Sequence, residues 1–303
     1  MPHRSFEFVL LGVLALCWGS SYMWIGLALE TVPPATLMAV RVLLASVVLL
    51  LIMMARGIRL PLDRRHWKQF FIQSLLNGTG PWLFLAWGQQ YAGTAVSSVL
   101  NSTSPLWVFA LSFLFLKRGQ LPGKRQLTGA LLGFSGVVMI IGIGALESLG
   151  QNLLPQLAVF LSAALYGIAA LRGHLFKDLP PIVPATGMLM CSALVLVPLS
   201  LLTEAPWTLT PGATGWVSMI VLGLVCTAFA FLIYFRLLST LGPMGTASQA
   251  YLRAGVGVFL GVVFLSESLD LETFAGICLA ILGVVLINWP RGRNASQPAS
   301  AVK

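Results

Sequence analysis

Charge is scarce in this sequence. Only 9% of its 303 residues are Asp, Glu, Lys or Arg, whereas 57% are hydrophobic. With a mean hydropathy of +0.90, the chain has too little polar surface to cover a water-soluble globule. This scarcity excludes a soluble domain and indicates a chain that is surrounded mostly by lipid.

Cysteine is also rare. The four cysteines, Cys17, Cys191, Cys226 and Cys278, all fall inside apolar runs, where a thiol behaves as a small hydrophobic group. The pattern excludes a disulfide framework and a metal site, and we expect neither a metal nor another cofactor.

Recognisable catalytic motifs are missing as well. The sequence holds no G-x-S-x-G elbow and no H-E-x-x-H motif, and no Ser lies beside a His or Lys at membrane depth. The three histidines, His3, His66 and His174, lie in loops or at helix ends. We therefore expect that the protein is not an enzyme.

What the chain does contain is a series of apolar runs, each long enough for a helix to cross a hydrocarbon core of about 30 Å. They predict an all-α integral membrane protein with one membrane domain over 1–303. The predicted ten transmembrane helices are 6–27, 35–54, 69–91, 95–116, 126–144, 153–171, 182–202, 215–235, 245–265 and 273–289. We interpret the first as a true span because its apolar run exceeds a typical signal-peptide core.

The basic residues separate by side under this ten-span prediction. Sixteen of the eighteen are Arg4, Arg56, Arg59, Arg64, Arg65, Lys68, Lys117, Arg118, Lys124, Arg125, Arg172, Lys177, Arg236, Arg291, Arg293 and Lys303. They fall on one side, which the positive-inside rule makes the cytoplasm, with both termini and a polar tail over 291–303. The other side carries Glu30, Glu147, Glu204, Glu267, Asp270 and Glu272. The net charge of +9 then indicates contact with anionic membrane lipid and not with nucleic acid.

An internal repeat relates the two halves. The stretch from Gly129 to Gly136 in the fifth span resembles that from Gly276 to Gly283 in the tenth. Similar offsets relate Gly19 to Gly167, Gly93 to Gly242 and Phe115 to Phe264. We predict a duplication, with repeats over 5–149 and 150–290. Because each has five spans, the second is inverted, which is typical of transporters that alternate between two faces of a membrane.

The Trp18-Gly19-Ser20-Ser21 stretch, Arg41, Pro105 in the fourth span and the glycine-rich fifth and tenth spans together resemble the drug/metabolite transporter (DMT) superfamily. The likeness is to its EamA-type exporters, and among them to YddG-type exporters of aromatic and other amino acids. It implies a bacterial inner-membrane exporter whose central cavity is bounded by spans one, three, four, six, eight and nine. One departure is that an acidic residue follows the fourth span of the second half, Glu267, whereas the first half has Lys117 and Arg118.

The ionisable residues inside the spans limit which substrates and which kinds of proton coupling the sequence allows. None of the nine acidic residues lies in the middle of a span, which argues against a proton relay at the midplane and against a permanently cationic substrate. Arg253 lies inside the ninth span and is either a counter-ion for a substrate carboxylate or an arginine satisfied by helix contacts. For Arg41, nearer the outer surface, we favour a structural role, in which it extends to the surface or pairs with Glu30.

Polar and aromatic side chains inside the spans complete the candidate site. The predicted substrate-binding residues are Arg253, Trp18, Tyr22, Asn77, Trp82, Asn101, Trp107, Tyr166, Tyr234, Gln249 and Tyr251. For each of them apart from Arg253, packing or helix-to-helix hydrogen bonding is the alternative. Predicted hinges are Pro81 and Pro105, which free the carbonyls of Asn77 and Asn101, with Gly255 and Gly257.

The sequence thus predicts an exporter of small metabolites that works by alternating access, and it favours amino acids, including aromatic ones, as the substrates. The alternatives are the same fold exporting other metabolites or drugs, and a channel-like facilitator.

Overall fold

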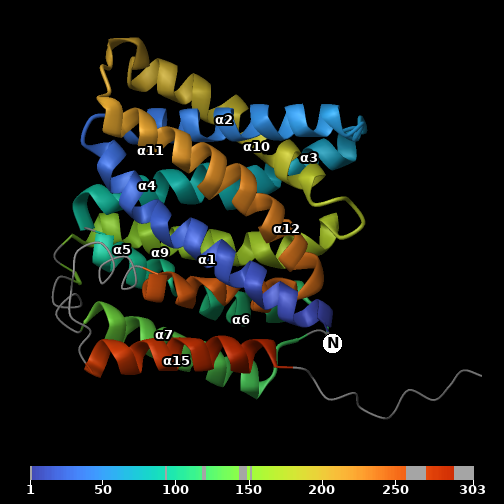
Figure 1. The fold of residues 1–303 in the computed structure, drawn as a ribbon, viewed down its shortest axis with the longest axis vertical. Coiled ribbons are helices and arrows are strands. Elements are labelled where there is room, and N and C mark those ends of the chain that lie inside the picture. Colours follow the sequence, from blue (N-terminus) through green and yellow to red (C-terminus); the bar gives the residue numbers. More distant parts are fainter. Residues whose placement is uncertain are drawn as a thin grey trace, which may run out of the picture.

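The computed structural model describes residues 2–92, 94–117, 121–142, 149–150, 152–256 and 271–289. Over these residues the chain is helical and has no β-strand. Long helices pack side by side and run across the longest axis of the molecule, from left to right in Figure 1. Several residues used in the predictions lie outside the described residues: Gly93, Arg118, Glu147, Gly257, Phe264, Glu267, Asp270 and the tail over 291–303.

The first half begins with two long helices and continues with shorter ones. Its helices are α1 (Pro2–Leu29), α2 (Pro34–Ala55), α3 (Arg64–Ser74), the π-helical turn η1 (Leu75–Thr79), α4 (Gly80–Ala92), α5 (Thr94–Asn101), α6 (Ser104–Phe115) and α7 (Lys124–Ile141).

The second half follows a similar order. Its helices are α9 (Leu153–Arg172), η3 (Gly173–Phe176), α10 (Ile182–Thr203), η4 (Pro206–Thr208), α11 (Ala213–Gly223), the π-helical turn η5 (Leu224–Phe229), α12 (Ala230–Thr240), α13 (Gly242–Ala247) and α15 (Leu271–Asn288). Residues 249–256 are also helical.

Seven helices in the described part of the chain are long and apolar enough to cross a membrane. They are Ser5–Leu29, Pro34–Ala55, Val96–Phe115, Leu153–Phe176, Ile182–Thr203, Ala213–Thr240 and Leu271–Asn288. The other predicted spans correspond to helical residues that are more polar or shorter: α3 begins with Arg64 and Arg65, α7 begins with Lys124, and only 245–256 of the ninth span is described.

The predicted break at Pro105 is present, because α5 ends at Asn101 and α6 begins at Ser104. The hydroxyl of Ser104 donates to the carbonyl of Asn101 at 2.6 Å, so this carbonyl does not stay free as predicted. At Pro81 the distortion takes another form, the π turn η1, in which the N–H of Gly80 bonds to the carbonyl of Leu75. Such a turn inserts one residue and widens the helix.

A second π turn, η5, lies between α11 and α12, in the helix of the second half that corresponds to α3 and α4. The two halves therefore share a local distortion that is rare in proteins as well as an order of helices. No proline lies in the second π turn. A missing proline N–H, which accounts for the distortion at Pro81, therefore does not account for this one.

Glycines bring α7 and α15 into backbone contact, because residues without a side chain let two apolar helices approach closely. A Cβ atom added to Gly136 would lie 2.6 Å from the carbonyl oxygen of Gly276, and one added to Gly129 would lie 2.8 Å from that of Gly283. The contacts are reciprocal, since a Cβ on Gly276 or Gly283 would meet the carbonyl of Gly136 or Gly129. The two helices therefore run antiparallel, side by side (Figure 1).

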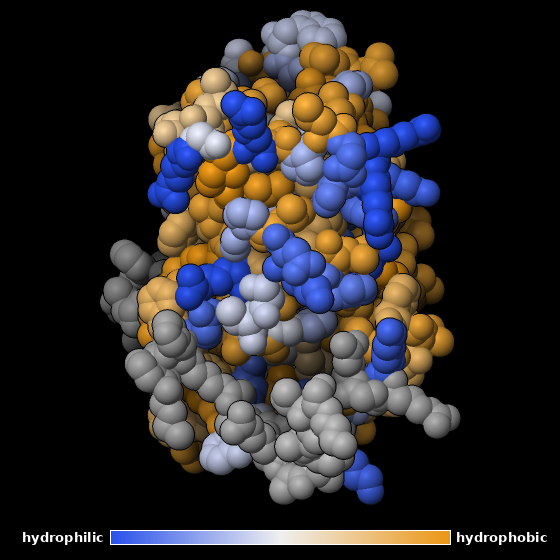
Figure 2. All heavy atoms as spheres, turned by 90° about the vertical axis from the view of Figure 1, so that its right-hand side faces the viewer, coloured by the Kyte–Doolittle hydropathy of each residue, from blue (hydrophilic) through white to orange (hydrophobic). Residues whose placement is uncertain are grey.

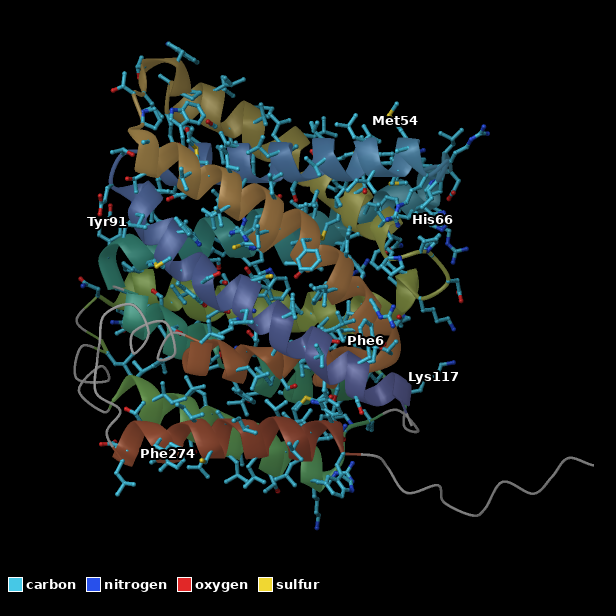
Figure 3. The ribbon with its side chains drawn as sticks, in the orientation of Figure 1. Phe6, Met54, His66, Tyr91, Lys117 and Phe274 are labelled. Carbon is cyan, nitrogen blue, oxygen red and sulfur yellow. The ribbon has the colours of Figure 1, made fainter. Side chains whose placement is uncertain are left out.

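The two ends of the bundle differ in charge. Met54, His66 and Lys117 lie at one end, and Tyr91 and Phe274 lie at the other (Figure 3). Hydrophilic side chains gather among apolar ones on the first of these ends (Figure 2).

At this end Asp63 caps α3 by accepting the N–H of His66 at 3.0 Å. Its hydrogen bonds with His66 hold the pKa of Asp63 below its ordinary value. Between the ends, large apolar side chains such as Leu43, Val47 and Leu51 of α2 are exposed.

Candidate functional site

A small cavity lies where both halves of the chain meet. Its volume is about 20 Å³, roughly the space of a single water molecule. It is lined by Trp18, Ser21, Tyr22, Ile25, Arg41, Trp82, Leu85, Tyr166 and Arg253. These residues come from α1, α2, α4, α9 and the helical residues 249–256. The lining is aromatic and apolar except for two guanidinium groups and the hydroxyls.

Arg41 belongs to this cavity, and it neither extends to the surface nor pairs with Glu30, the two arrangements expected from the sequence. Its side chain is only 3% exposed and its hydrogen bonds are made across the bundle to η5. Its Nε donates to the hydroxyl of Thr227 at 2.6 Å and its Nη2 donates to the carbonyl of Cys226 at 3.2 Å. The partner proposed for Arg41, Glu30, is an exposed residue at the end of the bundle, so Arg41 is turned inward and not toward the surface.

The π turn η5 explains why these acceptors are available. The hydroxyl of Thr227 donates to the carbonyl of Leu222 at 2.7 Å, which leaves its oxygen lone pairs to accept from Arg41. The carbonyl of Cys226 also accepts the indole N–H of Trp18 at 3.0 Å. One distorted turn thus holds a cation from α2 and an aromatic ring from α1.

Arg253 lies over the Trp18 ring. Its guanidinium carbon is 5.0 Å from the centroid of that ring, and its Nε donates to the side-chain oxygen of Gln249 at 2.7 Å. The guanidinium carbon of Arg41 lies 4.2 Å from the centroid of the Trp82 ring. Each arginine is therefore paired with one indole in a cation–π contact.

Two predicted site residues, Asn101 and Gln249, lie next to the cavity and are not part of its lining. The side-chain amide of Asn101 donates to the hydroxyl of Tyr22 at 2.7 Å, and the broken helix between α5 and α6 places it there. Gln249 reaches the cavity only through Arg253.

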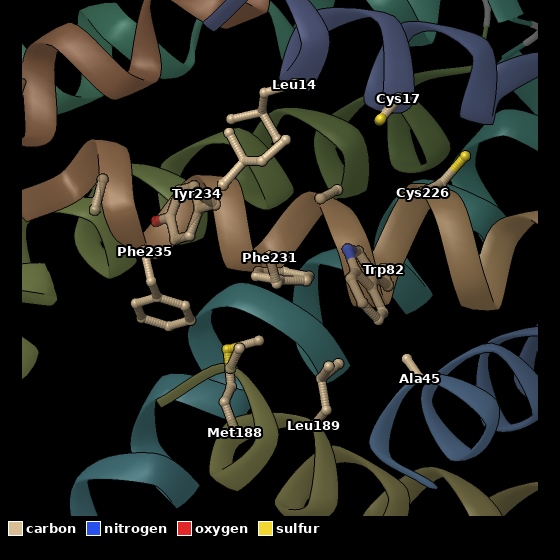
Figure 4. Close-up of a cluster of buried hydrophobic side chains, with 14 of the residues drawn as sticks. Leu14, Cys17, Ala45, Trp82, Met188, Leu189, Cys226, Phe231, Tyr234 and Phe235 are labelled. Atoms are coloured by element: carbon tan, nitrogen blue, oxygen red, sulfur yellow. The ribbon is translucent and has the colours of Figure 1, made fainter. Parts of the chain in front are cut away.

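Other predicted residues lie elsewhere. Trp107 packs on Phe160 with ring centroids 5.2 Å apart, and Tyr234 packs between Trp18, Phe231 and Phe235 in the buried cluster of Figure 4. Tyr251 is fully buried and contacts the backbone at Gly133 of α7. Asn77 lies against the sulfur of Met188 at 3.8 Å.

Carboxylates lie at the ends of the bundle and not at the cavity. Glu204 caps α2 at one end, accepting the N–H groups of Ala35 at 3.0 Å and Thr36 at 2.6 Å. At the other end Glu7 of α1 pairs with Arg236 of α12 at 2.8 Å. Within 2–92, 94–117, 121–142, 149–150, 152–256 and 271–289, no Asp or Glu lines the cavity, so its electrostatic character is positive.

Comparisons with known proteins agree with this architecture. The model of the EamA-like transporter family matches the chain twice, over residues 6–142 and 153–289. The chain is 28% identical to the uncharacterized transporter YoaV of Bacillus subtilis over 92% of this chain and 96% of YoaV. It is 26% identical to the uncharacterized inner membrane transporter YedA of Escherichia coli K12, over 95% of this chain and 92% of YedA.

A solved crystal structure superposes with a TM-score of 0.77 at 16% identity, covering 93% of this chain and 96% of that one, which shows a shared fold. Taken with the seven apolar helices and the double family match, these likenesses make the chain a multi-pass membrane protein that belongs to the EamA-like transporter family.

Proposed function

We propose that this protein exports a small carboxylate-bearing metabolite across a bacterial inner membrane by alternating access between two inverted five-helix repeats. Amino acids, including aromatic ones, are the class that the sequence favours. The observation that carries the proposal is the small cavity between the halves, with Arg41 and Arg253 in its lining and no carboxylate among its described lining residues.

The inverted repeat is supported by three features. The family model matches once in each half. The π turns η1 and η5 occupy corresponding helices. The reciprocal contacts of Gly129 with Gly283 and of Gly136 with Gly276 have the form expected of two related units facing each other across a two-fold axis. Under this proposal ten helices cross the membrane, and both termini lie in the cytoplasm because the basic residues gather at that end.

Alternating access is supported by contacts that join helices at both ends of the bundle and by the small size of the cavity. One end is tied by Glu204 between α10 and α2, and the other by Glu7 and Arg236 between α1 and α12. A cavity of about 20 Å³ has no room for a metabolite. Substrate therefore enters when helices at one end separate, and a continuous open pore is not required.

Reconstituted protein tests this function. Vesicles preloaded with an unlabelled solute are given the same solute in labelled form, and saturable counterflow is measured for phenylalanine, pentanoate, glycerol and choline. We expect counterflow of the carboxylates, reduced by Arg253→Gln and Arg253→Ala, and none of glycerol or choline. Transport of choline, or carboxylate flux that both variants leave unchanged, contradicts the proposal.

The main alternative is a channel-like facilitator. It predicts electrical conductance and flux without counterflow, so a bilayer recording of the same preparation separates the two. The absence of acidic residues from the described lining favours movement down the solute's own gradient over proton coupling. Uphill accumulation driven by a pH gradient would overturn this part of the proposal.

A further inference from the structure

The cavity contains one more cation than a single carboxylate needs. Arg41 and Arg253 both line it, and the salt bridges among the described residues involve neither of them. Two like charges in a small, mostly apolar space repel each other and are poorly solvated, so the arrangement is costly without a negative partner.

The hydrogen bonds of the two arginines leave donors available. A guanidinium carries five N–H groups. Arg41 uses Nε and Nη2 for Thr227 and Cys226, and Arg253 uses Nε for Gln249. Nη1 of Arg41 and both Nη atoms of Arg253 have no hydrogen-bond acceptor within the part of the chain that the structure describes.

Rings and acceptors hold both arginines in place. Trp82 lies against Arg41 and Trp18 lies against Arg253, and the indole N–H of Trp18 is itself tied to Cys226. One face of each ring is therefore occupied by a guanidinium group and does not bind the ammonium group of a substrate as well.

Building on the carboxylate transport proposed above, we propose that Arg41 is a second substrate-binding cation and that the preferred substrates carry two carboxylates. One guanidinium binds each carboxylate, and both charges in the cavity are neutralised together. A monocarboxylate leaves one guanidinium unpaired. Among amino acids, the acidic ones fit this site better than the aromatic ones.

Four five-carbon acids separate the contributions of the second carboxylate and of the amino group. Glutarate has two carboxylates, glutamate has two and an amine, pentanoate has one, and norvaline has one and an amine. Half-saturation concentrations for counterflow are measured for all four with the unmodified protein. We expect the second carboxylate to lower this concentration about tenfold or more, because hydrogen bonds between charged groups are strong in a dry site. Equal values for glutarate and pentanoate overturn the proposal.

Arg41→Gln then tests the residue. We expect it to remove the preference for glutarate over pentanoate while pentanoate flux persists through Arg253. Arg65→Gln, the same change at an exposed position outside the bundle, is the matched control and keeps the preference. An Arg41→Gln protein that still prefers glutarate overturns the assignment of Arg41.

The two proposals fail in different ways. If none of the four acids is exchanged, the carboxylate function itself is wrong and this inference falls with it. If pentanoate and norvaline are exchanged with the same half-saturation concentrations as glutarate and glutamate, the proposed function stands and only the second carboxylate is refuted. The panel on the unmodified protein gives this answer even if Arg41→Gln does not fold.

Discussion

At the residue scale, Thr227 is the contact that positions Arg41. Its hydroxyl accepts from Nε of Arg41 and donates to the carbonyl of Leu222. We predict that Thr227→Val, which keeps the shape of the side chain, leaves a buried donor unpaired at a cost of about 1–3 kcal/mol. It should raise the half-saturation concentration for glutarate more than that for pentanoate, and Thr227→Ser should restore it.

The same substitution at Thr203 is the control, because Thr203 is exposed and bonds only to the carbonyl of Leu199. Thr227→Val with unchanged kinetics for both acids would mean that Arg41 is held by Cys226 and Trp82 alone.

At the scale of helices, the contact between α7 and α15 depends on residues that have no side chain. A Cβ at Gly136 would lie 2.5 Å from the backbone nitrogen of Ala280, which no side-chain rotation can relieve. We predict that Gly136→Ala lowers the free energy of unfolding by about 1–3 kcal/mol, measured by thermal unfolding in detergent. Gly12→Ala in α1, where an added Cβ meets nothing within 4 Å, should be neutral or stabilising.

Some of the helix-scale structure could be predicted from sequence, and some could not. The break before Pro105 follows from a missing N–H, and the close approach of α7 and α15 follows from glycine spacing. The π turn η5 could not be predicted, because no proline or other residue pattern marks Leu224–Phe229. Its acceptors decide where Arg41 lies, so a wrong expectation for Arg41 followed from an unseen turn.

Part of the candidate site, like part of the helix-scale structure, could be predicted from the sequence. Polarity inside apolar spans was enough to select Arg253, Trp18, Tyr22, Trp82 and Tyr166, which the structure brings to one cavity. The same rule also selected Tyr251, whose ring fills the space beside Gly133. Composition identifies side chains that avoid lipid, but it does not distinguish a cavity wall from a helix contact, because both are interior.

At the scale of the whole molecule, the proposed inverted repeat predicts which residues lie on which side of the membrane. Lys117 follows α6 of the first half, and Glu272 begins the last helix of the second half. We expect a membrane-impermeant maleimide to label Glu272→Cys in intact cells and Lys117→Cys only after the cells are opened. Both proteins carry Cys278→Ser, since Cys278 is the exposed one among the native cysteines. Labelling of both positions from one side would refute the inversion.

The paired glycines have a consequence for sequence change over time. A methyl group on Gly136 would clash with the backbone at Gly276, and a methyl group on Gly276 would clash with the backbone at Gly136. A single separation of the two helices therefore makes room for both methyl groups. Alanine at both positions should therefore destabilise the protein by less than the sum of the two single changes. After one of these glycines is lost, selection to keep the other weakens, and the two should disappear together among descendants of this gene.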